Sequence, residues 1–377
     1  MAEASTLTQP TSDAPAEKPK RHRLRTALLV IVALVLAIGI IGTVANHFGT
    51  DYNSLSEADQ ETLGQYDAFL AQTKDAPVWK GYQLNDHPVM SLEGRTGSAY
   101  LINPSTEPGP IFATRIDMPS ASGMTVYRLA VTSPDTLLIR FSPIAGSFPN
   151  ELNPIPTIEG SQVFWERYSN DQAASDLTQT FLSTVTHEAF HKLEQENWAW
   201  DGNIDNSGRF STEEVDDEQL TLLDQAYGSL AKAQEQLELD TPDPAIVKQG
   251  VIGYLDTIDQ LKSLNPDFYE GYTSAETFEG TAQYVRDKAN QAAGIDLPAM
   301  YSPNRGKSVP FSEVVSLIRN GDIDVSLIPS YVIYESGVVL CESMDLVGYD
   351  YQDALNNATP GNARTLEQLA REAMQQS

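Results

Sequence analysis

Two histidines and a glutamate stand close together in the stretch Thr-His-Glu-Ala-Phe-His at residues 186–191. On an α-helix, side chains four residues apart lie on one face about a turn apart. His187 and His191 can therefore direct their imidazoles at a single metal ion. Imidazole nitrogens bind zinc, and the carboxylate of Glu188 can accept a proton from water on such an ion. The pattern predicts a helical zinc site that carries its own general base. The alternative is a helix that holds these residues by chance.

A catalytic zinc site needs a third protein ligand and keeps a fourth position open for water. In the extended pattern H-E-x-x-H-x-x-G-x-x-H the third histidine would occupy position 197, which is Asn197. No histidine follows His191, so a downstream ligand must be a carboxylate or, less often, another oxygen donor. The competing carboxylates are Glu194, Glu196, Glu213, Glu214 and Glu279.

Glu279 is the preferred third ligand because Gly280 follows it directly within an otherwise helical pattern. Glycine costs ~1 kcal/mol of helix propensity relative to alanine, so its presence there indicates a packing reason. A neighbouring helix that approaches closely would be such a reason. Glu276, one turn earlier, could orient His187 or His191 by accepting a hydrogen bond, or it could be a surface carboxylate.

His187–His191 and the stretch Glu279-Gly-Thr-Ala-Gln-Tyr284 together resemble the gluzincin zinc metallopeptidases, with their aminopeptidase N-like and thermolysin-like catalytic domains. The resemblance implies a zincin-like domain that hydrolyses peptide bonds. It implies that His187, His191 and Glu279 hold Zn²⁺ and that Glu188 is the general base. Peptides or proteins would be the substrates.

A later stretch, Tyr331-Val-Ile-Tyr334-Glu-Ser-Gly337, resembles the helix that these enzymes place beyond the zinc site. There a tyrosine donates its hydroxyl to the tetrahedral intermediate. Tyr334 is the first choice for this role and Tyr331 the second, and both could equally be ordinary packed tyrosines. The chain lacks the Gly-x-Met-Glu-Asn stretch with which aminopeptidases hold a substrate's amino terminus, so the resemblance does not extend to exopeptidase action.

Two other functions fit the same residues. The chain could be an anchored binding or scaffold ectodomain of zincin fold without catalysis. It could also be a zinc hydrolase that acts on a non-protein component of the cell envelope. The net charge of -28 makes nucleic acid an improbable partner. The single cysteine, Cys341, excludes an intramolecular disulfide.

An apolar run at residues 26–46 follows a basic tail at residues 1–25. At 1.5 Å per residue the run can cross the ~30 Å hydrocarbon layer of a bilayer. Basic residues before it and none directly after it predict an amino terminus in the cytoplasm and a catalytic domain outside. We expect an uncleaved, single-pass signal anchor in a plasma membrane of bacterial type. The alternative is a cleaved signal peptide, whose apolar region usually spans only about 7–15 residues.

The remaining chain divides into three segments. Residues 47–75 predict a juxtamembrane helix with Ser56 as its N-cap. Residues 76–160 predict a β-rich subdomain, and residues 161–377 predict a helical zinc-binding subdomain. An acidic loop at 200–217 interrupts the helices of this second subdomain. Expected strands are 98–103, 110–115, 124–131 and 136–141, the last a candidate to pair with an extended substrate. Expected helices are 171–198, 218–239, 244–264, 274–292, 310–319, 331–347 and 364–374. The fold class is α+β, with a small mixed or antiparallel sheet before a mostly helical half.

Overall fold

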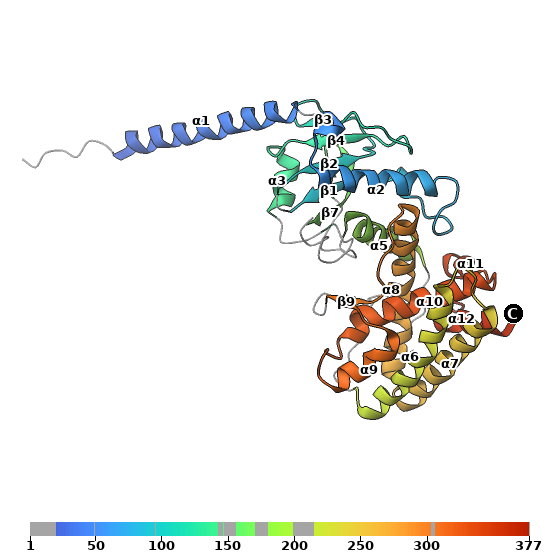
Figure 1. The fold of residues 1–377 in the computed structure, drawn as a ribbon. Coiled ribbons are helices and arrows are strands. Elements are labelled where there is room, and N and C mark those ends of the chain that lie inside the picture. The colour runs from blue at the N-terminus through green and yellow to red at the C-terminus, as the bar shows by residue number, and fades with distance from the viewer. Residues whose placement is uncertain are drawn as a thin grey trace, which may run out of the picture.

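The structure is a computed structural model that describes residues 20–48, 50–94, 96–141, 146, 156–169, 180–198, 215–302 and 306–376. Its architecture is mixed α+β, as the sequence predicts. A five-stranded sheet lies between a long amino-terminal helix and a larger helical half (Figure 1).

The amino-terminal helix α1 (Lys20–Asn46) is the one described helix that is long and apolar enough to cross a membrane, judged by length and composition. Helix α2 (Glu57–Thr73) follows it. The backbone N–H of Asp59 donates to the Ser56 hydroxyl at 3.2 Å, which confirms Ser56 as the N-cap. The apolar stripe of α2 is buried against the sheet and the helical half.

The sheet has the strand order β3-β4-β2-β1-β7 and is antiparallel except for the parallel pair β1–β7. Its strands are β1 (Val89–Glu93), β2 (Ala99–Ile102), β3 (Ala113–Arg115), β4 (Val126–Leu129) and β7 (Phe164–Tyr168). Three of the expected strands are confirmed. Strand β7 lies beyond residue 160, where helices were expected to begin. Two small hairpins pair β5 (Thr157–Ile158) with β6 (Ser161–Gln162) and β8 (Tyr301–Ser302) with β9 (Lys307–Ser308).

The strand expected at 136–141 is wrong, because this segment forms the helix α3 (Pro134–Arg140). Pro134 occupies the first helical turn, where its missing N–H costs nothing, and Asp135 suits the positive end of the helix dipole. The short apolar run at 137–139 fits a strand or a buried helix equally well by periodicity. Ile139 packs on the sheet face formed by Met90 and Trp165 among others, so α3 covers this face instead of extending the sheet.

The helical half contains α5 (Phe181–Leu193), α6 (Asp217–Leu237), α7 (Pro244–Leu264), α8 (Pro266–Ala292), α9 (Phe311–Arg319), α10 (Ile333–Leu346), α11 (Tyr351–Asn356) and α12 (Leu366–Gln376). The bounds expected for the helix at 244–264 are confirmed. Helix α8 begins earlier than expected because Asn265 caps it and Pro266 opens its first turn. Most of the loop expected at 200–217 lies outside the described residues, together with Glu213 and Glu214.

Helices α1 and α5 meet the sheet at opposite edges. The Asn46 side chain at the end of α1 donates to Thr114 Oγ1 and to the Arg128 carbonyl, each at 3.0 Å, on the β3–β4 edge. Helix α5 packs beside β7 at the other edge and against α8 (Figure 1). The sheet thus separates the amino-terminal helix from the helix that carries the paired histidines.

Candidate metal centre

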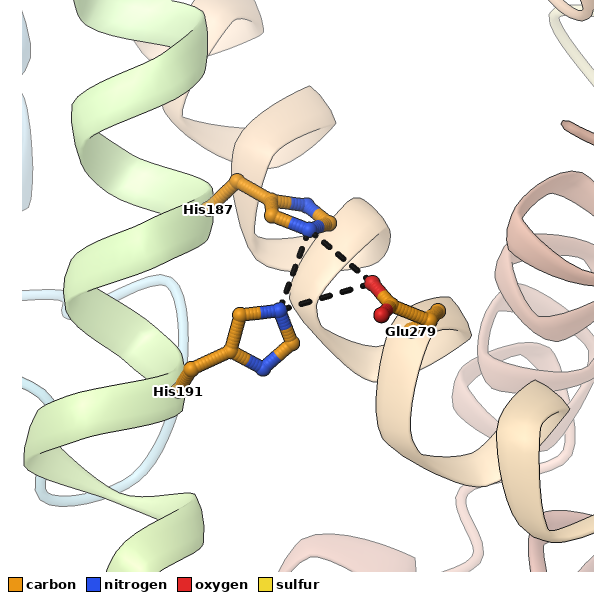
Figure 2. A group of neighbouring side chains, drawn as sticks. All are labelled: His187, His191 and Glu279. Carbon is orange, nitrogen blue, oxygen red and sulfur yellow. Dashed lines mark hydrogen bonds and ion pairs between the residues drawn. The ribbon is translucent and has the colours of Figure 1, made fainter. Parts of the chain in front are cut away.

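His187 and His191 face Glu279 across the contact between α5 and α8 (Figure 2). The Nε2 atoms of His187 and His191 lie 3.2 and 3.4 Å from the same carboxylate oxygen of Glu279. The two Nε2 atoms lie 3.1 Å apart. All three side chains are largely buried. The structure thus brings together the three residues that the sequence predicted as metal ligands.

The separations of these three atoms fit a tetrahedral metal site. Ligands about 2.0–2.1 Å from a tetrahedral zinc ion lie ~3.3 Å from one another. The observed separations of 3.1, 3.2 and 3.4 Å bracket that value. Two imidazoles and one carboxylate are also a donor set that zinc accepts in catalytic sites, with one coordination position left for water.

The nearby competing carboxylates have other surroundings. Glu196 pairs with Lys192 one turn earlier, at the surface. Glu194 is the C-cap residue of α5 and lies close to Gly81. Its pKa is raised to about 7 by burial, so its charged form is disfavoured. Among the described carboxylates, Glu279 alone joins the two histidines in a group that could hold a metal ion.

Gln195 fixes the orientation of His191, a role that sequence reasoning missed. The Gln195 Nε2 donates to the Phe278 carbonyl and to Thr281 Oγ1, each at 2.7 Å. The amide oxygen Oε1 consequently faces His191 Nδ1, which must carry the proton in order to donate. When the ring is neutral, His191 Nε2 therefore carries the lone pair and faces the other two candidate ligands. The spacing of His191 and Gln195, four residues, was the available sequence signal.

Aromatic rings stack on both histidines. Phe278 stacks on His191 with ring centroids 4.2 Å apart, and Tyr334 stacks on His187 at 5.7 Å. Tyr331 lies in the preceding π-helical turn (Ile328–Val332) and lines a surface cavity of about 560 Å³ with residues of the segment 318–330. Of the two tyrosines predicted for the site, Tyr334 therefore stacks on a candidate ligand, His187.

The close helix approach expected at Gly280 is found, and the neighbour is α10. A Cβ atom added to Gly280 would lie 2.6 Å from the Cα atom of Gly337, and one added to Gly337 would lie 2.5 Å from that of Gly280. Side chains cannot occupy such a contact, so both positions need glycine. This approach holds the first turn of α10, which carries Tyr334, beside His187.

The charges of the three candidate ligands support one another. Burial raises the pKa of Glu279, but hydrogen bonds from His187 and His191 and their positive charge outweigh it and hold that pKa well below its usual range. Burial lowers the pKa of His191, but its contacts with Glu279 outweigh this and raise the pKa. An ionised carboxylate therefore faces the two imidazoles, which is an environment suited to exchanging protons for a cation.

Glu276 is fully buried, so the expectation of a surface carboxylate is wrong. Its Oε1 accepts hydrogen bonds from the hydroxyls of Tyr254 and Ser336, each at 2.5 Å. No hydrogen bond among the described residues joins it to His187 or His191. Burial raises the pKa of Glu276 to about 7. The orienting contact expected from Glu276 is made instead by Gln195.

Glu188, the predicted general base, is partly exposed on α5. It interacts electrostatically with a second acid, Glu166 on β7. Burial and the negative charge of Glu188 raise the pKa of Glu166 to about 9. Glu166 is therefore protonated at neutral pH. Sequence reasoning missed it because it lies in a strand that was not expected.

Comparisons of the chain with protein-family models, with curated proteins and with solved structures found no match.

Proposed function

We propose that this protein is a membrane-anchored, extracytoplasmic zinc metallopeptidase with a zincin-like catalytic domain. The observation that carries the proposal is the convergence of His187 Nε2, His191 Nε2 and Glu279 Oε2 at separations of 3.1–3.4 Å. The tautomer that Gln195 imposes on His191 supports it, because that tautomer leaves a nitrogen lone pair in the cluster.

Zinc held by these three residues would supply Lewis-acid polarisation of the scissile carbonyl and lower the pKa of water toward ~7. Glu188 would accept a proton from the attacking water and return it to the leaving amine. Tyr334, beside His187, would donate its hydroxyl to the developing oxyanion. Burial raises the pKa of Glu166 to about 9, so Glu166 is not the base in this proposal.

Helix α1 supports the proposed location. It is long and apolar enough to span a bilayer, and the basic residues that precede its apolar run favour an amino terminus in the cytoplasm. The catalytic domain would then lie outside a plasma membrane of bacterial type. The acidity of the chain agrees with a peptide or protein substrate and no nucleic acid.

Glu188→Gln tests the proposal. The amide cannot accept a proton, so hydrolysis of a peptide library should fall by about 10²–10⁴-fold while the bound zinc is retained. Glu196→Gln is the matched control, since Glu196 pairs with Lys192 at the surface, and it should keep both zinc and activity. A Glu188→Gln protein that cleaves peptides as fast as wild type would contradict the proposed base.

The same assay separates the other functions. A zinc-loaded wild-type protein that cleaves no peptide would contradict the peptidase proposal and favour an anchored binding domain. Release of products from purified cell-envelope material, without peptide cleavage, would favour a hydrolase of a non-protein component.

A further inference from the structure

The end of α1 is bonded to the sheet at a defined depth. The hydroxyl oxygens of Thr43 and Thr132 are hydrogen-bonded at 3.2 Å, and the Asn46 side chain donates to the Arg128 carbonyl. A Cβ added to Gly42 would lie 2.8 Å from Thr132 Cγ2, so the chain after β4 touches the last turn of α1 directly. Helix α1 and this edge of the sheet therefore form one connected unit.

This connection places the chain after β4 at the level of the membrane boundary if α1 spans a bilayer. The apolar run that ends at Asn46 is ~30 Å long at 1.5 Å per residue, which matches the hydrocarbon thickness. Gly42 and Thr43 then lie about one turn, ~5 Å, inside the outer boundary. Thr132, in contact with both, shares their depth.

Large apolar side chains are exposed around this point. Ala113 pairs with Leu129, and the Ala130 N–H donates to the Phe112 carbonyl, so Ile111 lies across from Val131 next to Thr132. Helix α3 lies on the side from which α1 approaches the sheet (Figure 1). The exposed fractions are 71% for Phe48, 61% for Ile111, 51% for Val131, 38% for Leu137 and 85% for Phe141. We call these five residues the boundary set.

Exposure of these apolar side chains to water is unfavourable. Because they lie at the level of the membrane boundary, a lipid surface is the partner that we expect to cover them. Side chains of this kind at the level of the head groups bury their apolar surface among acyl chains. The acidic chain offers little attraction to anionic lipid head groups, so burial of apolar surface would hold this face at the membrane.

We infer that the boundary set inserts into the outer leaflet of the bilayer and fixes the orientation of the catalytic domain on the membrane. The inference rests on the part of the proposed function that puts α1 across a membrane. The catalytic domain then does not rotate freely relative to the membrane. The β3–β4 edge and α3 lie on the lipid, and the metal centre lies beside β7, the strand at the opposite edge of the sheet from β3.

Environment-sensitive fluorophores on introduced cysteines test the inference in the full chain. The protein is reconstituted in vesicles of phosphatidylcholine and phosphatidylglycerol that carry a nitroxide near the head group or near the chain end. Cys341 is fully buried, so the introduced cysteine is the reactive one. The positions are Ile111→Cys and Val131→Cys, with Leu36→Cys within α1 as reference and Ile246→Cys, an exposed apolar position on α7, as control.

We expect blue-shifted emission at 111 and 131, with stronger quenching by the shallow nitroxide than by the deep one. The label at 36 should be quenched best by the deep nitroxide, and the label at 246 by neither. Quenching at 36 with water-like emission at 111 and 131 would overturn the inference and leave the anchor intact. Blue shifts at 111 and 131 without lipid quenching would indicate a protein partner and also overturn it. No quenching at 36 would overturn the anchor as well.

Discussion

Helix α8 carries two buried carboxyl groups one turn apart, and their pKa values move in opposite directions. Burial raises the pKa of Glu276 to about 7. Glu279 is buried as well, but His187 and His191 hold its pKa well below the usual range. The neighbours differ because Glu279 faces α5 and its imidazoles, whereas Glu276 faces hydroxyls of α7 and α10. Burial alone therefore does not decide the charge of a carboxyl group, because neighbouring groups can favour its ionised form.

Replacing each of these two glutamates by glutamine should give the largest difference, which is a difference in zinc affinity. Glu279→Gln removes the anionic donor and should weaken zinc binding by more than about 100-fold, measured by competition with a chromophoric chelator. Glu276→Gln keeps an oxygen that can accept from Tyr254 and Ser336, and it should bind zinc like wild type. Equal zinc affinity in the two variants would contradict the distinction between them.

Removing the amide that orients His191 should have the next largest effect. Gln195→Ala frees the imidazole to rotate or change tautomer, so zinc affinity should fall by about 10–100-fold. Asn197→Ala, in the same 3₁₀ turn (Gln195–Asn197) but exposed, is the matched control and should leave the affinity unchanged. An unaltered affinity in Gln195→Ala would mean that Glu279 and the ring stacking suffice to orient the site.

Gly280→Ala tests the close contact between Gly280 on α8 and Gly337 on α10. The added methyl group meets the α10 backbone at Gly337, so the free energy of unfolding should fall by about 1–3 kcal/mol. Gly228→Ala on α6 is the control, because an added Cβ there has nothing within 4 Å. It should stabilise the protein by roughly 0.5–1 kcal/mol. Thermal unfolding in detergent measures both, and stabilisation by Gly280→Ala would contradict the close contact.

Glu166 extends the comparison, since it is a third buried acid, and its effect should appear as a change of stability with pH. Its pKa rises from 4.5 to about 9, mainly because of burial. Between these pH values the unfolded chain releases the proton that the folded chain keeps. Wild type should therefore lose stability relative to Glu166→Gln as the pH rises, by at most ~1.4 kcal/mol per pH unit. Urea unfolding from pH 5 to pH 9 measures this, and a difference that stays constant with pH would contradict it.

Local signals explain what could be predicted from the sequence. Ser56 and Pro244 mark helix starts through groups within one turn, and α2 and α7 begin where they indicate. His187 and His191 are paired by helical spacing alone. Glu279 could be proposed because Gly280 beside it needed a packing explanation, which the contact with Gly337 supplies.

Tertiary contacts explain what could not be predicted. The run 137–139 has no periodicity that separates a strand from a helix, and its packing on the sheet decides for α3. The orientation of Gln195 depends on acceptors contributed by α8, far away in the sequence. Glu276 and Glu279 look alike in the sequence, and only the helices packed against each side of α8 shift their pKa values in opposite directions.

Anomalous diffraction at the zinc absorption edge, from crystals of the zinc-loaded protein, tests the central claim most directly. The account predicts one strong peak within ~2.0–2.2 Å of His187 Nε2, His191 Nε2 and a carboxylate oxygen of Glu279. No peak at these atoms, or a peak that the two histidines share with a different acid, would contradict it.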